Sequence, residues 1–310
     1  MKRTLASVLV CACMAAPLAA QESDVTNVTT TTTTVSTGVD LLDGSWYVQD
    51  ATPLATGKVD LRFTAGWESA AFPANRGDSD DDYFLTPAIH WGCCNNVELS
   101  IGVPMWLGDG GDVGALRDGN FDTNVGMLWR IAEDWVGEYD VALAAKARIP
   151  TGDASDKVDG ELRLIMTHNY DSGVRSHFNI FGASMNGTND ETVDWDGDDD
   201  GWGGGWGRGW MNGWWGGRNH MGEQRDFQYG AVIGADGPLC GDGAVRWVFD
   251  YLHRSSEHDG QNNWNMAEVG WEWSVDDASK LGFSVQVNLD RSTDAPNVGA
   301  MLTYAHALTF

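Results

Sequence analysis

The stretch that decides the fold runs from residue 57 to residue 68 and reads Gly-Lys-Val-Asp-Leu-Arg-Phe-Thr-Ala-Gly-Trp-Glu. Apolar side chains occupy every second position from Val59 to Trp67, and Asp60 and Arg62 lie between them. Successive side chains of a β-strand point to opposite faces. This segment therefore predicts a strand with one apolar face and one charged face.

The same alternation recurs along the chain and predicts about twelve strands, with an uncertainty of about two. Several are about ten to thirteen residues long, which is enough to cross a bilayer when the strand is tilted. Strands of a soluble β-sandwich are shorter, and their apolar faces meet in a core. After 57–68 we expect strands near 85–91, 97–103, 121–130, 140–149, 161–167, 176–184, 226–235, 243–254, 264–274, 279–290 and 297–310.

The links between these strands alternate in length. Short links near 94–96, 132–137, 171–175, 236–243 and 275–278 alternate with longer polar ones at 69–82, 105–119, 150–160, 185–225, 255–263 and 290–296. Short turns on one rim and long loops on the other are typical of outer-membrane barrels. We predict an all-β, antiparallel up-and-down transmembrane β-barrel with short periplasmic turns and long extracellular loops.

The ends of the chain predict export and assembly. Residues 1–20 have the charges and the short apolar run of a cleaved signal peptide, and 21–50 form a Thr-rich leader that we expect to be disordered in the periplasm. Residues 51–310 are assigned to the barrel. The last strand ends in Tyr304, Leu308 and Phe310, a pattern that resembles the signal read by the barrel-assembly machinery. We expect the protein in the cell outer membrane, in contact with its lipid.

Charge and motifs exclude several function classes. The formal net charge of −26 argues against nucleic-acid binding, because phosphates would be repelled. Nucleophile elbows, paired-histidine metal sites and phosphate-binding loops are absent from the sequence, so we do not expect an enzyme. Past the signal segment, Cys93, Cys94 and Cys240 remain. Cys240 could pair with either of the other two, or all three could be free.

The charged faces of the strands are the first candidate functional feature. Fixed charges in a pore tune which solutes pass. They could instead pair with one another and close the interior, and the sequence leaves both alternatives open. The residues that we expect to line the pore are Arg62, Arg130, Asp140, Lys146, Arg148, Arg163, Asp250 and Glu268.

The long loop at 185–225 is the second candidate feature. Asp194, Asp196, Asp198 and Asp200 precede Gly201 with the alternating spacing of a calcium-binding loop, although Gly stands at position 207, where a bidentate Glu belongs. The loop holds either a calcium ion or a solvated acidic tip, and no other cofactor is expected. The aromatic residues that follow are Trp202, Trp206, Trp210, Trp214 and Trp215. They could stack on sugars, enter the outer leaflet of the membrane or fold into the barrel mouth as a plug, or they could simply belong to a low-complexity surface loop.

Several short motifs occur in a fixed order in the barrel region. Gly119 begins the run Gly-Asn-Phe-Asp-Thr-Asn-Val-Gly, Ile149 begins Ile-Pro-Thr-Gly, His177 begins His-Phe-Asn, and Gly102 begins Gly-Val-Pro. In this order they resemble a family of outer-membrane proteins labelled for the MetA pathway of phenol degradation. The resemblance covers about residues 57–310 and implies a barrel with a role in passage across the membrane. It implies no particular substrate for this chain.

Three functions are compatible with these features. The first is a passive outer-membrane channel or transporter for small solutes, with hydrophobic and aromatic ones among the candidates. The second is a structural or adhesive surface protein that acts through the loop at 185–225. The third is a soluble exported β-protein, in which the apolar faces would meet in a dry core.

Overall fold

The computed structural model of the chain describes residues 49–68, 82–107, 122–135, 138–151, 157–184, 207–209, 215–217, 227–239, 243–255, 263–290 and 298–308. Most of these residues belong to antiparallel strands. Within the described residues, no helix has the length and apolar character needed to cross a membrane.

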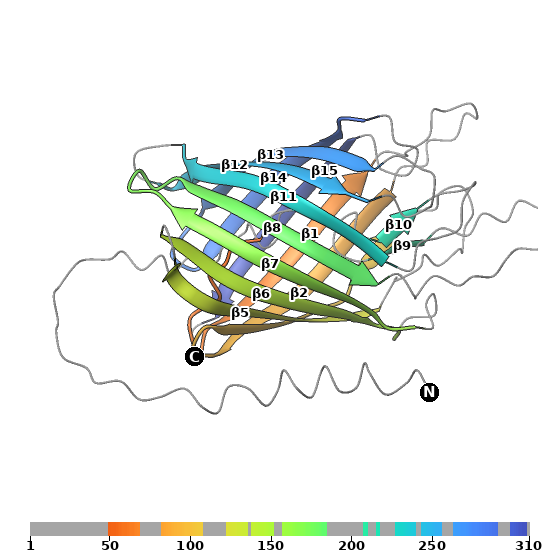
Figure 1. Cartoon of the computed structure of the whole chain (residues 1–310), viewed down its shortest axis with the longest axis horizontal. Helices are drawn as coiled ribbons and strands as arrows, with labels where there is room; N and C mark the ends of the chain where they lie inside the picture. Colours follow the sequence, from red (N-terminus) through yellow and green to blue (C-terminus); the bar gives the residue numbers. More distant parts are fainter. Residues whose placement is uncertain are drawn as a thin grey trace, which may run out of the picture. The chain divides into compact units, whose positions relative to one another are not determined.

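The main sheet closes on itself (Figure 1). Each strand pairs antiparallel with its neighbours, and β1 pairs with both β15 and β2. The first half of the sheet consists of β1 (Val59–Glu68), β2 (Asp82–Cys94), β3 (Val97–Gly102), β4 (Met105–Leu107), β5 (Thr123–Trp135), β6 (Tyr139–Ile149) and β7 (Asp159–Asn169). The second half consists of β8 (Arg175–Ser184), β11 (Phe227–Pro238), β12 (Val245–Arg254), β13 (Trp264–Ser274), β14 (Ser279–Asn288) and β15 (Val298–Leu308).

The short strands β3 and β4 together occupy one position in the barrel. Both pair with β2, and they are separated only by Val103 and Pro104. Proline has no backbone N–H and cannot complete a ladder, so it interrupts the strand here. Counted in this way, the barrel has twelve strands, and the predicted fold and strand number are confirmed.

The links between strands alternate in length, as the sequence predicts. Five short links, which include 95–96, 170–174 and 275–278, lie at one rim, which we call the short-turn rim. Six longer ones lie at the other, which we call the long-loop rim. The longest of these, residues 185–226, contains a separate pair of antiparallel strands, β9 (Gly207–Gly209) and β10 (Trp215–Gly217).

The two faces of the barrel wall differ in chemistry in the way that the alternation predicts. In β13, Glu268 and Glu272 point inward and are nearly completely buried, whereas Val269, Trp271 and Trp273 are about half exposed. Most buried polar residues of the described chain lie on such inward-facing positions. The apolar faces therefore do not meet in a dry centre, and the arrangement is inside-out relative to a soluble protein.

Candidate functional site

A short segment ahead of β1 lies inside the barrel. Gln49 is 7% exposed, Asp50 is 1% exposed and Ala51 is fully buried, although all three precede the first strand. We call residues 49–55 the lumen strap. The predicted leader ends at residue 50, so its last two residues contribute to the barrel interior; residues 21–48 lie outside the described part of the chain.

The inner end of the strap is held by two side chains of the barrel wall. The side-chain amide of Asn179 in β8 accepts from the Gln49 backbone N–H at 2.8 Å and donates to the Gln49 carbonyl at 3.0 Å. Thr167 Oγ1 in β7 accepts from the Ala51 N–H at 3.0 Å. Buried backbone groups need such partners, and here side chains of the wall replace a neighbouring strand.

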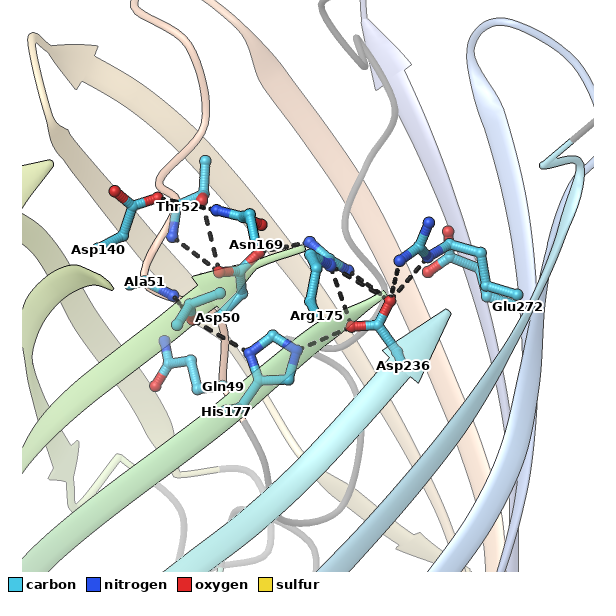
Figure 2. A network of polar contacts seen from close by, with 12 residues as sticks. Gln49, Asp50, Ala51, Thr52, Asp140, Asn169, Arg175, His177, Asp236 and Glu272 are labelled. Carbon is cyan, nitrogen blue, oxygen red and sulfur yellow. Dashed lines mark hydrogen bonds and ion pairs between the residues drawn. The ribbon is translucent and has the colours of Figure 1, made fainter. Parts of the chain in front are cut away.

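Charged groups also hold the inner end of the strap, at Asp50 (Figure 2). Arg175 Nη1 lies 2.7 Å from Asp50 Oδ2, and Arg175 Nε donates to Asp236 Oδ2 at 3.0 Å. Asp236 also accepts from Arg246 Nε at 2.7 Å, and its Oδ2 lies 2.8 Å from His177 Nε2. The Asp236 carboxylate is therefore surrounded by two guanidinium groups and an imidazole, and one of these guanidinium groups reaches the strap.

His177 connects Asp236 to Thr167, which bonds the strap. Its Nδ1 lies 3.1 Å from Thr167 Oγ1, which accepts the Ala51 N–H, and its Nε2 faces Asp236. Figure 2 shows His177 between Asp236 and the strap residues Asp50 and Ala51. Because the members share partners, we expect a change at one of them to affect the others.

The outer end of the strap is held at the short-turn rim. Glu98 Oε2 accepts from the Leu54 N–H at 2.9 Å, while Glu98 Oε1 lies 2.6 Å from His90 Nδ1. Gly57 N donates to the Gly92 carbonyl at 2.7 Å. A Cβ at Gly92 would lie 2.2 Å from the Ala55 carbonyl oxygen, so the strap can cross here only because position 92 has no side chain.

The strap also has an apolar contact. Ala51 packs in a buried cluster with Leu128 of β5, Ala142 and Ala144 of β6, and Ile165 of β7. These four wall residues face the interior of the barrel. Most other inward-facing positions carry polar side chains. Two of the wall residues are alanines, and their small size leaves space for the strap backbone between the strands.

Ion pairs occur elsewhere on the inner wall. Arg148 Nη2 lies 2.5 Å from Asp159 Oδ2, and Arg163 Nε donates to Glu161 Oε1 at 3.0 Å. Lys280 Nζ lies 2.6 Å from Glu272 Oε1. Arg163 also donates to Asn179, so its pair adjoins the strap. The interior thus combines charges of both signs at close range.

The structure places the predicted pore-lining residues on the inner face. Lys146 and Arg130 are half-buried, and Arg130 bonds Asn96 near the short-turn rim. The other six predicted pore-lining residues are almost completely buried: Arg62, Asp140, Arg148, Arg163, Asp250 and Glu268. The role of all eight residues in selecting solutes stays a prediction.

Other predicted residues fall at or beyond the edges of the described chain. Tyr304 and Leu308 lie in β15, opposite Phe63 and Val59 of β1. Phe310, Cys240, the four aspartates and the five tryptophan side chains of the 185–225 loop lie outside the described part, so the calcium and adhesion hypotheses stay predictions. In the described ranges, no cluster of three or more His, Cys, Asp or Glu side chains could hold a metal ion.

Sequence reasoning missed the strap and most of the residues that hold it. The alternation of β8 places Arg175, His177 and Asn179 on one face, and this signal was available. Nothing comparable marks Gln49 and Asp50, which follow a polar segment without periodicity. Their burial depends on partners more than 120 residues away in the chain.

The chain is similar in fold to solved outer-membrane proteins. No protein-family model and no curated protein matches it. The COG4313 outer membrane channel from Pseudomonas putida F1 is 11% identical with a TM-score of 0.51, covering 84% of this chain and 99% of that one. The NanC porin is 6% identical (TM-score 0.48; 81% and 100% covered), and the P. putida toluene transporter TodX is 8% identical (TM-score 0.41; 83% and 91% covered). At 11% identity, the first likeness shows that this chain shares the fold of an outer-membrane channel.

Proposed function

We propose that the chain is a passive outer-membrane channel or transporter for small solutes, in which the lumen strap limits passage. The observation that carries this proposal is a closed barrel with an apolar exterior, a charged interior and a buried segment across that interior. Hydrophobic and aromatic solutes remain among the candidates for its cargo.

The exterior supports a location in lipid. Leu162, Ile233 and Val269 point outward and are each about 60% exposed. Burial of an apolar side chain such as these is worth about 1.5–3 kcal/mol, and a closed barrel has no second sheet to provide it. Hydrocarbon can provide it instead, whereas a soluble exported protein would leave these faces in water. The predicted signal peptide would export the chain from the cytoplasm, and the predicted assembly signal would direct it into the outer membrane.

The interior supports a restricted pathway. The strap is bonded to Asn179 and Thr167 at its inner end and to Glu98 at its outer end, so it crosses from the β7–β8 wall to the β2–β3 wall. A solute that follows the barrel axis must pass beside the strap or displace it. Because the surrounding charges are of both signs, we expect little preference for anions over cations.

Planar-bilayer recording of a variant without the charge of Asp50 tests this proposal. Asp50→Asn keeps the size of the side chain and removes its charge from the contact with Arg175. A hydrogen bond to a charged group is worth about 1.5–3 kcal/mol. Because the variant holds its strap more weakly by this amount, the fraction of time that the channel spends in the conducting state should rise by roughly tenfold or more. Asp276→Asn is the matched control, because it removes the same charge from an exposed turn at the same rim.

Two results would contradict the proposal in different ways. If folded wild-type protein and both variants never conduct, the channel function is wrong. If all three conduct equally, the chain is a channel but the strap does not limit it.

A further inference from the structure

Two adjacent thiols lie on the same side of the chain at the end of β2. Cys93 and Cys94 are both unbridged and half-buried, and their sulfur atoms are 3.3 Å apart. In a regular strand, adjacent side chains point to opposite faces. Here Gly92 pairs with Glu98 and Cys94 with Val97, so Cys93 is an extra residue. This β-bulge breaks the alternation and brings the two thiols together.

The thiol pair lies between Gly92 and Asn95, and both of these residues bond the connection from the strap to β1. On one side, Gly92 N donates to the Lys58 carbonyl at 3.0 Å, and the Gly92 carbonyl accepts from Gly57 N at 2.7 Å. On the other side, Thr56 Oγ1 donates to Asn95 Oδ1 at 3.2 Å. The backbone from 92 to 95 thus holds residues 56–58, which continue from the outer end of the strap into β1, and we call it the outer anchor of the strap. A conformational change within it must move these contacts.

We propose that Cys93 and Cys94 form a reversible thiol–disulfide pair, and that its oxidation loosens the outer anchor of the lumen strap. The oxidant is a small disulfide of the glutathione type. Its S–S bond breaks and one S–S bond forms between Cys93 and Cys94. The two thiol protons leave the protein, and the oxidant ends as two thiol molecules, so atoms and electrons balance.

The covalent geometry explains why closure should disturb the anchor. Adjacent Cα atoms are about 3.8 Å apart across a trans peptide, whereas disulfide-bonded cysteines usually have Cα atoms about 4.4–6.8 Å apart. A bond between neighbours therefore forces the intervening backbone into a strained arrangement. Strained disulfides are more easily reduced, so we expect the bond to open again with a small thiol.

Peptide mapping of the full chain tests the bond itself. Trypsin cuts after Arg76 and Arg117, so one peptide, 77–117, carries both thiols, and Cys240 lies in a different peptide, 226–246. After treatment with oxidised glutathione, we expect peptide 77–117 to be lighter by two hydrogen atoms and to resist alkylation. Excess reduced glutathione should reverse both changes.

Hydrogen–deuterium exchange of the same samples tests the effect on the anchor, and it requires no channel activity. Oxidation should speed exchange of the amides in 54–58 by about tenfold, because the Gly57 N–H contact with Gly92 is weakened. The double variant Cys93→Ser, Cys94→Ser is the control and should not respond to the oxidant. It keeps side chains of similar size and no longer contains a thiol pair.

Three results would overturn the inference. The first is a cross-link between peptides 77–117 and 226–246, which would make Cys240 the partner. The second is the absence of any disulfide within 77–117 under oxidant. The third is a disulfide within 77–117 that leaves the exchange of 54–58 unchanged, in which case the thiol pair is not coupled to the strap.

Discussion

Asp50 and Arg175 form an ion pair inside the barrel, with 2.7 Å between Asp50 Oδ2 and Arg175 Nη1. Asp50 is 1% exposed and belongs to the segment before the first strand, whereas Arg175 begins β8 on the barrel wall. Arg175 also bonds Asp236 in the neighbouring strand β11. The guanidinium group therefore joins the strap to two strands of the wall.

Loss of this guanidinium group should destabilise the folded barrel. Arg175→Ala leaves the buried Asp50 without its guanidinium partner and removes one of the cations around Asp236. Removing one partner of a buried pair costs about 3–5 kcal/mol, and the one-fifth exposure of Arg175 places the expected loss toward the lower end. Denaturant unfolding in lipid vesicles measures this change in the free energy of unfolding.

Arg130→Ala is the matched control for Arg175→Ala. Arg130 has a similar exposed fraction, but its carboxylate partner Glu133 is 64% exposed. An exposed pair is worth about 0–1 kcal/mol. Equal losses for the two variants would mean that the pair with the strap contributes no more than a surface contact.

Substitution of Gly92 by alanine should dislodge the outer end of the strap. The new Cβ would lie 2.2 Å from the Ala55 carbonyl oxygen, so the backbone must move. Overpacking of this kind costs about 1–3 kcal/mol. Gly160→Ala is the control, because its Cβ would meet only the Lys146 carbonyl oxygen at 3.8 Å. Thermal unfolding, followed by gel migration of heated samples, should separate the two variants; identical midpoints would contradict the crossing at Gly92.

An arginine on the outer face tests whether that face contacts lipid. Leu162 is 58% exposed within β7, as the fourth of its eleven residues, and Leu239 is 62% exposed just after β11 at the short-turn rim. Arginine facing lipid costs about 2–4 kcal/mol at mid-bilayer and about 0–1 kcal/mol near the interface. Leu162→Arg should therefore reduce stability in vesicles far more than Leu239→Arg. In a protein surrounded by water, the two substitutions would have similarly small effects.

The barrel wall was predictable from sequence because local chemistry determines it. Most strands repeat the rule seen from Val59 to Trp67, with outward-facing apolar and inward-facing polar side chains alternating. Arg163 and Glu268, which this rule assigns to the inner face, are 3% and 1% exposed. The break between β3 and β4 can also be located from sequence, since Pro104 follows the strand predicted for 97–103. The prediction of a loop from residue 105 is wrong for 105–107, which form β4.

The strap was not predictable, because its burial depends on distant partners. Gln49 and Asp50 are polar and follow a Thr-rich tract, so nothing local indicates that they enter the barrel. Their bonds are made by Asn179 and Arg175, and the space near Ala51 depends on Ala142. The bulge at Cys93 was missed for a similar reason, since it is a feature of the pairing between β2 and β3.

The central claim is that the lumen strap, held against β7 and β8, limits passage through the barrel. The most direct measurement is the conductance of Ala51→Cys, Thr167→Cys in a chain whose other cysteines are serine. Ala51 N lies 3.0 Å from Thr167 Oγ1, so the strap and the wall are in direct contact at these two residues, and we expect the two new thiols to bond when oxidised. We expect low conductance in the oxidised, locked barrel and a rise of about tenfold when a reductant frees the strap. Equal conductance in the locked and released forms would contradict the claim.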